Sequence, residues 1–465
     1  MKSTIQFGTD GWRGVIADDF TFENLSKVAL ATAKYLARHK KIKNGVIVGY
    51  DARFLSKEFA EKTAEVLANS NIKVVLSDAI SSTPMVSLLS KSLSAAGGVI
   101  ITASHNPAKY NGYKLKGDFG GPAHPEMIAK LEAQLSKVMR SKVPSKRSFA
   151  ELVAKGMITY RDFTTAYVED VKSKVDLQAI RSAGISIAFD AMYGSGQGVL
   201  QRLVPVSVAL RDHFNPSFGG GHPEPLAQNL KELSAAVVRH KCSIGIATDG
   251  DADRVGAVDE RGNFVDSHRI FALLLKYLVE TKGWRGEVAK SFSVSKLIDK
   301  MCAKYGPTLH ETPVGFKHLC RLMTERDILI AAEESGGLGV KGHIPERDGI
   351  YIGLLLCEMM AVRKKSLGQL VDELMSEFGW HFFNRYDAHL TEKEKQRILS
   401  AYKKGVRRVA GMDVLDVDTK DGFKLLVEKG WVLVRASGTE PLIRFYAEAD
   451  SPEKVDRLLK GAREI

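Results

Sequence analysis

The sequence predicts an α/β protein of three related α/β domains, each with a mixed, largely parallel sheet, followed by a smaller C-terminal α+β domain. Short apolar runs alternate with helical patterns over about the first 370 residues, which is typical of βαβ units. Over about the last 90 residues the pattern changes to one typical of antiparallel strands. At 465 residues the chain is too long for a single hydrophobic core. We therefore expect domains at 1–150, 151–262, 263–368 and 369–465.

The first domain is expected to contain three short strands and two amphipathic helices. Its apolar runs are short and lie between turn residues, as in buried parallel strands. The expected strands are 46–50, 74–77 and 98–102, and the expected helices are 25–39 and 56–68. A basic, serine-containing stretch at 137–148 then indicates a linker.

The same pattern restarts in the second and third domains. A strand at 185–189 ends in an Asp-Ala-Met-Tyr-Gly loop that echoes the Asp-Ala-Arg-Phe loop after 46–50, which indicates a repeated unit. The third domain pairs a strand at 328–332 with a long helix at 348–364.

The last domain has a different pattern. Strands at 423–427 and 431–436 flank a Glu-Lys-Gly turn, and a further strand is expected at 443–448. Residues 378–390 loosely alternate polar and apolar positions, and 451–462 form a helix that starts at Ser-Pro-Glu. This combination predicts an antiparallel sheet with helices.

Composition and charge disfavour several classes of protein. The N-terminal residues lack the apolar segment of a signal peptide, and no apolar stretch approaches the roughly 20 residues of a membrane span. The four cysteines show no paired short spacing, so neither a zinc site nor a disulfide framework is indicated. We therefore expect a cytoplasmic protein without a membrane partner. The net charge of +12 favours a small phosphorylated substrate over nucleic acid, because no nucleic-acid-binding motif accompanies the diffuse basic patches.

The segment Thr-Ala-Ser-His-Asn-Pro at 102–107 follows the apolar run 95–101, which is typical of a buried strand. It places the hydroxyl of Ser104 at the end of a strand, where open α/β sheets bind ligands. His105 comes next, and Asn-Pro favours a turn. Ser104 is thus a candidate nucleophile or phosphate carrier, although a plain polar turn has the same pattern.

Asp249, Asp251 and Asp253 alternate in a loop between two apolar strands. Three such carboxylates repel one another unless a cation neutralises them, and hard oxygen ligands suit Mg²⁺. An EF-hand is disfavoured because Arg254 stands where that loop needs glycine, and because strands flank the loop. A haloacid-dehalogenase-type phosphatase also carries Asp-x-Asp after an apolar strand, normally with Thr or Val where Asp253 stands. That phosphatase and a solvated acidic turn stay open as alternatives.

Further loops also carry polar groups after turns or strands. Arg435 begins an Arg-Ala-Ser-Gly-Thr string suited to holding a phosphate. Glu334 and Ser335 offer groups that hydrogen-bond a polyol. Glycines surround Arg13 near the N-terminus, and a turn precedes Lys317. Each of these is also typical of an ordinary polar turn or helix start.

In their order along the chain, these loops resemble those of the α-D-phosphohexomutase family, which contains phosphoglucomutase, phosphomannomutase and phosphoglucosamine mutase. The match runs from Gly8 to Arg444. The resemblance implies four domains around a central cleft and the interconversion of hexose 1-phosphates and hexose 6-phosphates. It also implies Mg²⁺ as a cofactor and a hexose 1,6-bisphosphate as intermediate and activator.

The resemblance assigns roles to individual residues. Ser104 would carry the phosphoryl group and would bind Mg²⁺ together with Asp249, Asp251 and Asp253. The expected catalytic residues are Ser104, His105, Lys114, Lys317 and Arg13. The expected substrate-binding residues are Glu333, Ser335, Arg254, Arg435, Ser437, Gly438 and Thr439.

One departure from the family pattern bears on the sugar and on the acid or base. Many phosphomannomutase and phosphoglucosamine mutase relatives have Gly-Glu-x-Ser-Gly-His, where this chain has Ala-Glu-Glu-Ser-Gly-Gly at 332–337. We therefore favour Lys317 as general acid or base, and glucose over glucosamine, with mannose as a second substrate. A phosphoglucosamine mutase, a phosphatase with Asp249 as nucleophile and a non-catalytic phosphosugar-binding protein stay open, as do a monomer and a homodimer. A hinge is expected near 365–375.

Overall fold

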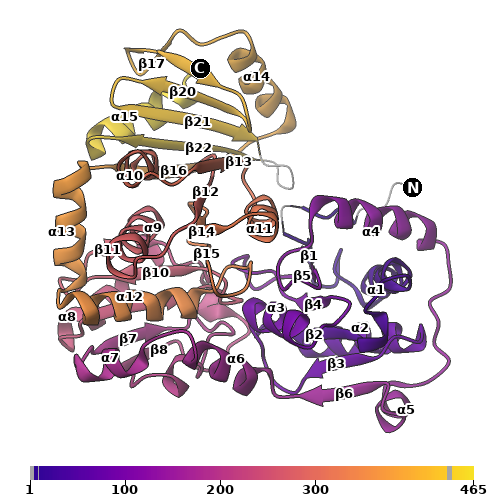
Figure 1. Ribbon diagram of the computed structural model, residues 1–465. Helices are drawn as coiled ribbons and strands as arrows, with labels where there is room; N and C mark the ends of the chain where they lie inside the picture. The colour runs from indigo at the N-terminus through magenta and orange to yellow at the C-terminus, as the bar shows by residue number, and fades with distance from the viewer. Residues whose placement is uncertain (1–4, 9, 437–441) are drawn as a thin grey trace.

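The computed structural model describes residues 5–8, 10–436 and 442–465. Along this part of the chain, three mixed sheets with flanking helices are followed by an antiparallel sheet (Figure 1). The predicted fold class is therefore confirmed. Among the described helices, none is both long and apolar enough to cross a membrane. The four cysteines are buried free thiols.

The first sheet has the strand order β1-β5-β4-β2-β3-β6. Strands β2, β3, β4 and β6 run parallel, β5 is antiparallel to β4, and β1 is antiparallel to β5 at the edge of the sheet. The strands are β1 (Trp12–Val15), β2 (Val46–Tyr50), β3 (Val74–Ser77), β4 (Gly98–Ile101), β5 (Tyr110–Lys116) and β6 (Ile158–Arg161), with helices α1 (Phe22–Leu36), α2 (Ser56–Asn69), α3 (Thr83–Ser92), α4 (Pro125–Val138) and α5 (Phe149–Ala154). The sheet thus takes its last strand from beyond residue 150, the expected end of the first domain.

The second sheet repeats this plan on a smaller scale, in the order β11-β10-β9-β7-β8. Strands β8, β7 and β9 run parallel, β10 is antiparallel to β9, and β11 is antiparallel to β10. The elements are α6 (Phe163–Lys172), α7 (Leu177–Ser182), β7 (Ile187–Asp190), β8 (Val208–Leu210), α8 (Lys231–Arg239), β9 (Ile244–Thr248), β10 (Val255–Val258) and β11 (Phe264–Val265).

The third sheet has the order β13-β12-β14-β15, with only β15 antiparallel to its neighbour among the described strands. Helix α12 is buried along almost its whole length and packs against the second sheet, as expected of a helix that is apolar on every side. The elements are α9 (Ser267–Lys276), β12 (Glu287–Ser291), α10 (Leu297–Tyr305), β13 (Leu309–Thr312), α11 (Phe316–Glu325), β14 (Ile328–Ala332), β15 (Leu338–Val340), α12 (Gly349–Arg363) and α13 (Leu367–Phe378).

The C-terminal sheet is antiparallel, in the order β16-β22-β21-β20-β19, and α15 covers one face. Helix α13, orange in Figure 1, runs along one edge of the molecule toward this sheet. The expected hinge at 365–375 therefore falls largely on a helix, which ends at Phe378 before Gly379 takes a φ of 87°. The elements are β16 (Phe382–His389), α14 (Glu392–Lys403), β17 (Arg408–Val409), β18 (Met412–Asp413), β19 (Asp416–Asp418), β20 (Phe423–Val427), β21 (Gly430–Ala436), β22 (Leu442–Ala449) and α15 (Pro452–Arg463).

A buried carboxylate connects this sheet to the third domain. Glu448, on β22, accepts hydrogen bonds from the backbone N–H of Lys296 at 3.1 Å and from the Trp431 indole at 3.3 Å. Its carboxylate also lies 3.0 Å from Nδ1 of His381. Burial would raise the pKa of Glu448, but its hydrogen bond and electrostatic interaction with His381 outweigh burial and lower the pKa to about 2. Glu448 is therefore ionised at neutral pH.

Candidate active site

Ser104 lies just beyond the end of β4, in a tight loop. Its φ is 53°, in the left-handed region that residues other than glycine adopt only at a cost, and its N–H donates to Oγ1 of Thr102 at 2.9 Å. The buried hydroxyl donates to Oδ2 of Asp249 at 3.0 Å and lies 3.4 Å from Nδ1 of His105. The loop therefore directs the hydroxyl of the first domain at the aspartate loop of the second.

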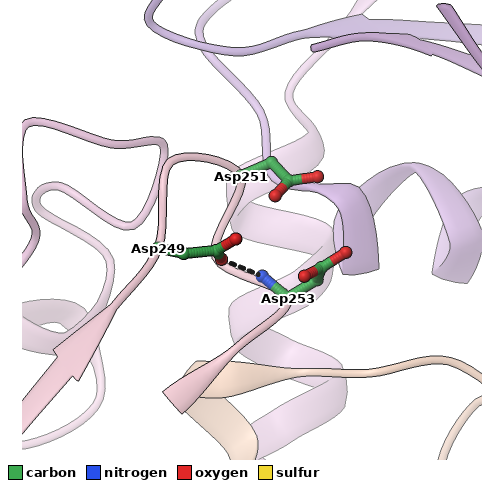
Figure 2. A group of neighbouring side chains, drawn as sticks. All are labelled: Asp249, Asp251 and Asp253. Carbon is green, nitrogen blue, oxygen red and sulfur yellow. Dashed lines mark hydrogen bonds between the residues drawn. The ribbon is translucent and has the colours of Figure 1, made fainter. Parts of the chain in front are cut away.

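The aspartate loop joins β9 to β10 and is fully buried. Asp249, Asp251 and Asp253 each offer a carboxylate oxygen, and these oxygens lie within 4.8 Å of one another (Figure 2). The turn is closed by Oδ1 of Asp249, which accepts the N–H of Asp253 at 3.0 Å and that of Arg254 at 3.1 Å. All three aspartates have 0% of their surface exposed.

The electrostatics of this loop fit a divalent cation. Burial, reinforced by Asp251 and Asp253, raises the pKa of Asp249 well above its usual value. Oδ1 of Asp251 and Oδ1 of Asp253 are buried and receive no hydrogen bond from the described residues. Such oxygens cost free energy unless they are paired, and three carboxylates form the hard donor set that Mg²⁺ prefers. The loop is thus a candidate Mg²⁺ site.

Lys114 reaches the aspartates from β5 and is itself almost completely buried. Its Nζ lies 2.7 Å from both Asp251 and Asp10 and 3.1 Å from Asp253. Burial would lower the pKa of Lys114, but the three carboxylates outweigh it and raise the pKa. This lysine is a fixed positive charge.

His105 and two arginines surround the serine loop. Burial, together with Arg254 and Arg13, lowers the pKa of His105 well below its usual value, so the ring is neutral at pH 7. Arg13 lies on β1 and donates to Oδ1 of Asn106 at 2.5 Å. Burial lowers the pKa of Arg13 as well.

Two further predicted site residues, Lys317 and Arg435, belong to the third and fourth domains. Lys317 is half-buried in the first turn of α11, and burial lowers its pKa. Arg435 is the penultimate residue of β21 and donates to Oδ2 of Asp421 at 2.9 Å. No contact within the described part of the chain ties either of these side chains to Ser104. Ser437, Gly438 and Thr439 lie outside the described residues.

Profiles of one protein family match nearly the whole chain. They are described as phosphoglucomutase/phosphomannomutase α/β/α domain I at residues 4–142, domain II at 165–262 and domain III at 266–378, and the C-terminal domain at 389–465. The chain belongs to this family, the α-D-phosphohexomutases. The resemblance seen in the sequence is confirmed.

Named relatives cover nearly the full length of this phosphohexomutase. A phosphoglucomutase/phosphomannomutase of Thermococcus kodakarensis is 30% identical over 98% of this chain and 96% of its own. A phosphoglucosamine/phosphogalactosamine mutase of Sulfurisphaera tokodaii is 28% identical over 99% and 98%. A crystal structure from Thermus thermophilus, provisionally named a phosphomannomutase, is 37% identical, covers 100% of this chain and 99% of its own, and superposes with a TM-score of 0.86. These names divide between different sugars.

The sugar-binding loop predicted for this phosphohexomutase lies between β14 and β15. Burial raises the pKa of Glu333 to about 7, although Arg347 partly offsets it. Ser335 is half-buried in the same loop. The neighbouring Glu334 accepts from Oγ of Ser293 at 2.5 Å.

Arg347 is a site residue that the sequence interpretation missed. It lies between β15 and α12, and its guanidinium is 2.8 Å from Asp253, 3.5 Å from Glu333 and hydrogen-bonded to Asp10. A side chain at Gly337, where many relatives have histidine, would meet Cδ of Arg347 at 2.3 Å. The side chain of Arg347 therefore fills the space beside Gly337 that a histidine at this position would enter. Its guanidinium also contacts both Glu333 and Asp253 of the aspartate loop.

A second missed contact links the second and fourth domains. Glu224, in the segment between β8 and α8, accepts from Nη1 of Arg254 at 3.0 Å and lies 3.8 Å from Nη2 of Arg385 on β16. Glu224 therefore lies between Arg254, next to the aspartate loop, and Arg385 of the C-terminal sheet.

Proposed function

We propose that this phosphohexomutase interconverts the 1-phosphate and 6-phosphate of glucose, and also those of mannose, with Ser104 as the phosphoryl carrier. The observation that carries the proposal is the Ser104 hydroxyl, 3.0 Å from Asp249 within a buried group of three carboxylates. Phosphoryl transfer needs charge neutralisation and in-line positioning more than covalent chemistry, and the buried cations Lys114 and Arg347 provide fixed positive charge.

Mg²⁺ fits Asp249, Asp251, Asp253 and the phosphoryl oxygen of a phosphorylated Ser104, and when bound it would neutralise charge on the phosphoryl group. Lys317 suits the role of general acid and base, because burial lowers its pKa and favours the neutral amine. In the same proposal, Glu333 and Ser335 hold sugar hydroxyls. Arg435, Ser437, Gly438 and Thr439 hold the substrate phosphate, with Arg254 and Arg13 as further cations.

The cycle begins and ends with phosphorylated Ser104. The bond between Oγ of Ser104 and phosphorus breaks as the free sugar hydroxyl forms its own bond to phosphorus, and the hydroxyl proton passes to Lys317. The resulting hexose 1,6-bisphosphate turns over in the cleft and returns its other phosphoryl group to Oγ of Ser104, while Lys317 returns the proton to the sugar oxygen. The neutral His105 need not act as base for Ser104.

The test is a coupled assay for conversion of glucose 1-phosphate to glucose 6-phosphate, with a trace of glucose 1,6-bisphosphate, alongside a measurement of inorganic phosphate. Isomerisation without phosphate release, lost in Ser104→Ala, supports the proposal. Ser90→Ala is the matched control, because Ser90 is a buried serine of α3 that donates only to its own helix. Full activity in Ser104→Ala contradicts it. Steady phosphate release points to a phosphatase using Asp249, and silence in both assays points to a binding protein.

The sugar is tested by comparing kcat/KM for the phosphates of glucose, mannose and glucosamine. The Glu-Glu-Ser-Gly-Gly string at 333–337 supports glucose. Glucose and mannose differ in the orientation of one hydroxyl, which a tolerant loop does not strongly reject. A higher kcat/KM for glucosamine phosphate contradicts this assignment. A cytoplasmic location and a monomer or homodimer complete the proposal.

A further inference from the structure

Arg53 is a buried cation that the proposed catalytic steps do not use. It lies in the loop between β2 and α2, and β2 is the neighbour of β4 in the first sheet, so this loop lies beside the Ser104 loop. The Arg53 side chain is 0% exposed, and its Nε lies 3.1 Å from Oδ2 of an equally buried Asp51. Asp51 is held in turn by the hydroxyl of Ser56 at 2.7 Å.

The guanidinium of Arg53 donates to four backbone carbonyls of the serine loop. Nη2 donates to the carbonyl oxygen of Ser104 at 2.5 Å and to that of Asn106 at 2.6 Å. Nη1 donates to those of Pro107 at 2.9 Å and Tyr110 at 3.0 Å. One planar side chain therefore fixes the loop on both sides of its turn.

These bonds fix the backbone of Ser104 without touching its hydroxyl. Ser104 has a φ of 53°, which the surrounding contacts must maintain. Its carbonyl oxygen lies between Nη2 of Arg53 and the backbone of Gly250, where a Cβ would approach that oxygen to 2.3 Å. The carbonyl of Ser104 is thus in contact with both Arg53 and the aspartate loop of the second domain.

The second domain also holds the guanidinium itself. Phe218, in a short 3₁₀ turn at Phe218–Gly220 between β8 and α8, places its ring 4.8 Å from Cζ of Arg53. The ring is buried, and a desolvated cation–π contact of this kind fixes the plane of the guanidinium. Arg53 is therefore held by two domains at once.

We propose that Arg53 is a positioning residue for phosphoryl transfer, and that the ring of Phe218 holds its guanidinium in place. It holds the Ser104 loop so that the hydroxyl faces Asp249, and it acts through the backbone rather than on the substrate. The proposal rests on the proposed function, because it assumes that Ser104 carries the phosphoryl group. Lysine cannot replace arginine here, since an ammonium group does not present donors in the planar fork that reaches four carbonyls.

The experiment compares Arg53→Lys with the matched control Arg211→Lys. Arg211 also pairs with an aspartate at a strand end, Asp190, and donates to a backbone carbonyl, but in the second sheet. For Arg53→Lys we expect kcat to fall by about 100-fold, since a misplacement near 1 Å costs about that much. KM should change by less than about threefold, because Arg53 contacts no proposed sugar-binding group. Single-turnover transfer from phosphorylated Ser104 to glucose 1-phosphate should slow by the same factor as kcat.

Thermal unfolding of the variants separates positioning from general destabilisation. Similar midpoints for the two lysine variants, with kcat lost in Arg53→Lys alone, support the proposal. A kcat within threefold of wild type, or a loss carried by KM, overturns it. If Arg53→Lys does not fold, Phe218→Leu tests the proposal instead, because it keeps the four hydrogen bonds of Arg53 and removes only the aromatic ring. A kcat about fivefold lower at unchanged KM supports the proposal. An unchanged kcat overturns it. A wild-type protein without mutase activity would overturn the proposed function, and this proposal with it.

Discussion

Glu333→Gln is expected to remove a pH dependence that the wild-type protein shows near neutrality. Burial raises the pKa of Glu333 from its usual 4.5 to about 7. In the proposed site, the ionised carboxylate accepts hydrogen bonds from sugar hydroxyls, and the protonated form is a poorer acceptor. The wild-type kcat/KM should therefore fall as the pH falls through about 7.

The size of this effect follows from the pKa. With a pKa of about 7, roughly 90% of Glu333 is ionised at pH 8 and roughly 10% at pH 6. The contribution of the carboxylate to kcat/KM should then fall about tenfold between these pH values. At pH 8, Glu333→Gln should lower kcat/KM by roughly 10-fold to 100-fold, the value of one charge-assisted hydrogen bond.

The assay is kcat/KM for glucose 1-phosphate at intervals from pH 6 to pH 8, for wild type and Glu333→Gln under identical buffer and Mg²⁺. The substrate phosphate also titrates near pH 6, but it does so equally in both proteins. The ratio of wild-type to variant kcat/KM therefore isolates Glu333.

That ratio should fall about fivefold to tenfold from pH 8 to pH 6, with a midpoint near pH 7. A constant ratio across the range would refute the reasoning. It would mean either that Glu333 does not titrate between pH 6 and pH 8 or that its charge does not contribute to kcat/KM. A ratio that rises toward low pH would show that the protonated acid is the binding form.

Three further predictions concern the metal, the proton and the docking of the C-terminal sheet. Asp251→Asn should weaken Mg²⁺ binding at least tenfold by calorimetry, because it removes a charged ligand; unchanged affinity would place Mg²⁺ elsewhere. Lys317→Met should lower kcat by 10² to 10⁴, the usual contribution of a general acid or base, and a loss confined to KM would count against that role. Glu448→Gln should lower the free energy of unfolding by about 3 kcal/mol at pH 7, from a pKa lowered to about 2. This stabilisation is present above pH 4.5 and is lost as the pH falls toward 2, so equal urea midpoints at pH 7 would contradict it.

Much of the fold could be predicted because its central strands are short apolar runs between turns. The strands expected at 46–50, 74–77, 328–332 and 423–427 have those bounds in the structure. The segment around Arg13 was harder, because its glycines are typical of a turn. It forms β1 by pairing with β5 about a hundred residues away, and local patterns do not show such pairing.

The candidate site was partly predictable for a similar reason. Ser104 and the aspartates lie in loops directly after strands, so their chemistry is visible in short strings of sequence. Arg347 and Glu224 gave no such signal. Arg347 meets Asp10 across 337 positions in the chain, and it precedes the buried helix α12, where a charged residue is unremarkable. Their roles arise from contacts between domains, which one sequence does not reveal.

The central claim is that Ser104 carries the phosphoryl group between the two positions of the sugar. The protein is incubated with glucose 1,6-bisphosphate labelled in its phosphates, the labelled peptide is identified by mass spectrometry, and glucose 1-phosphate is then added. The account predicts one label per chain, on Ser104, which passes to the sugar when glucose 1-phosphate is added. Label on Asp249, or label on Ser104 that glucose 1-phosphate does not remove, would contradict it.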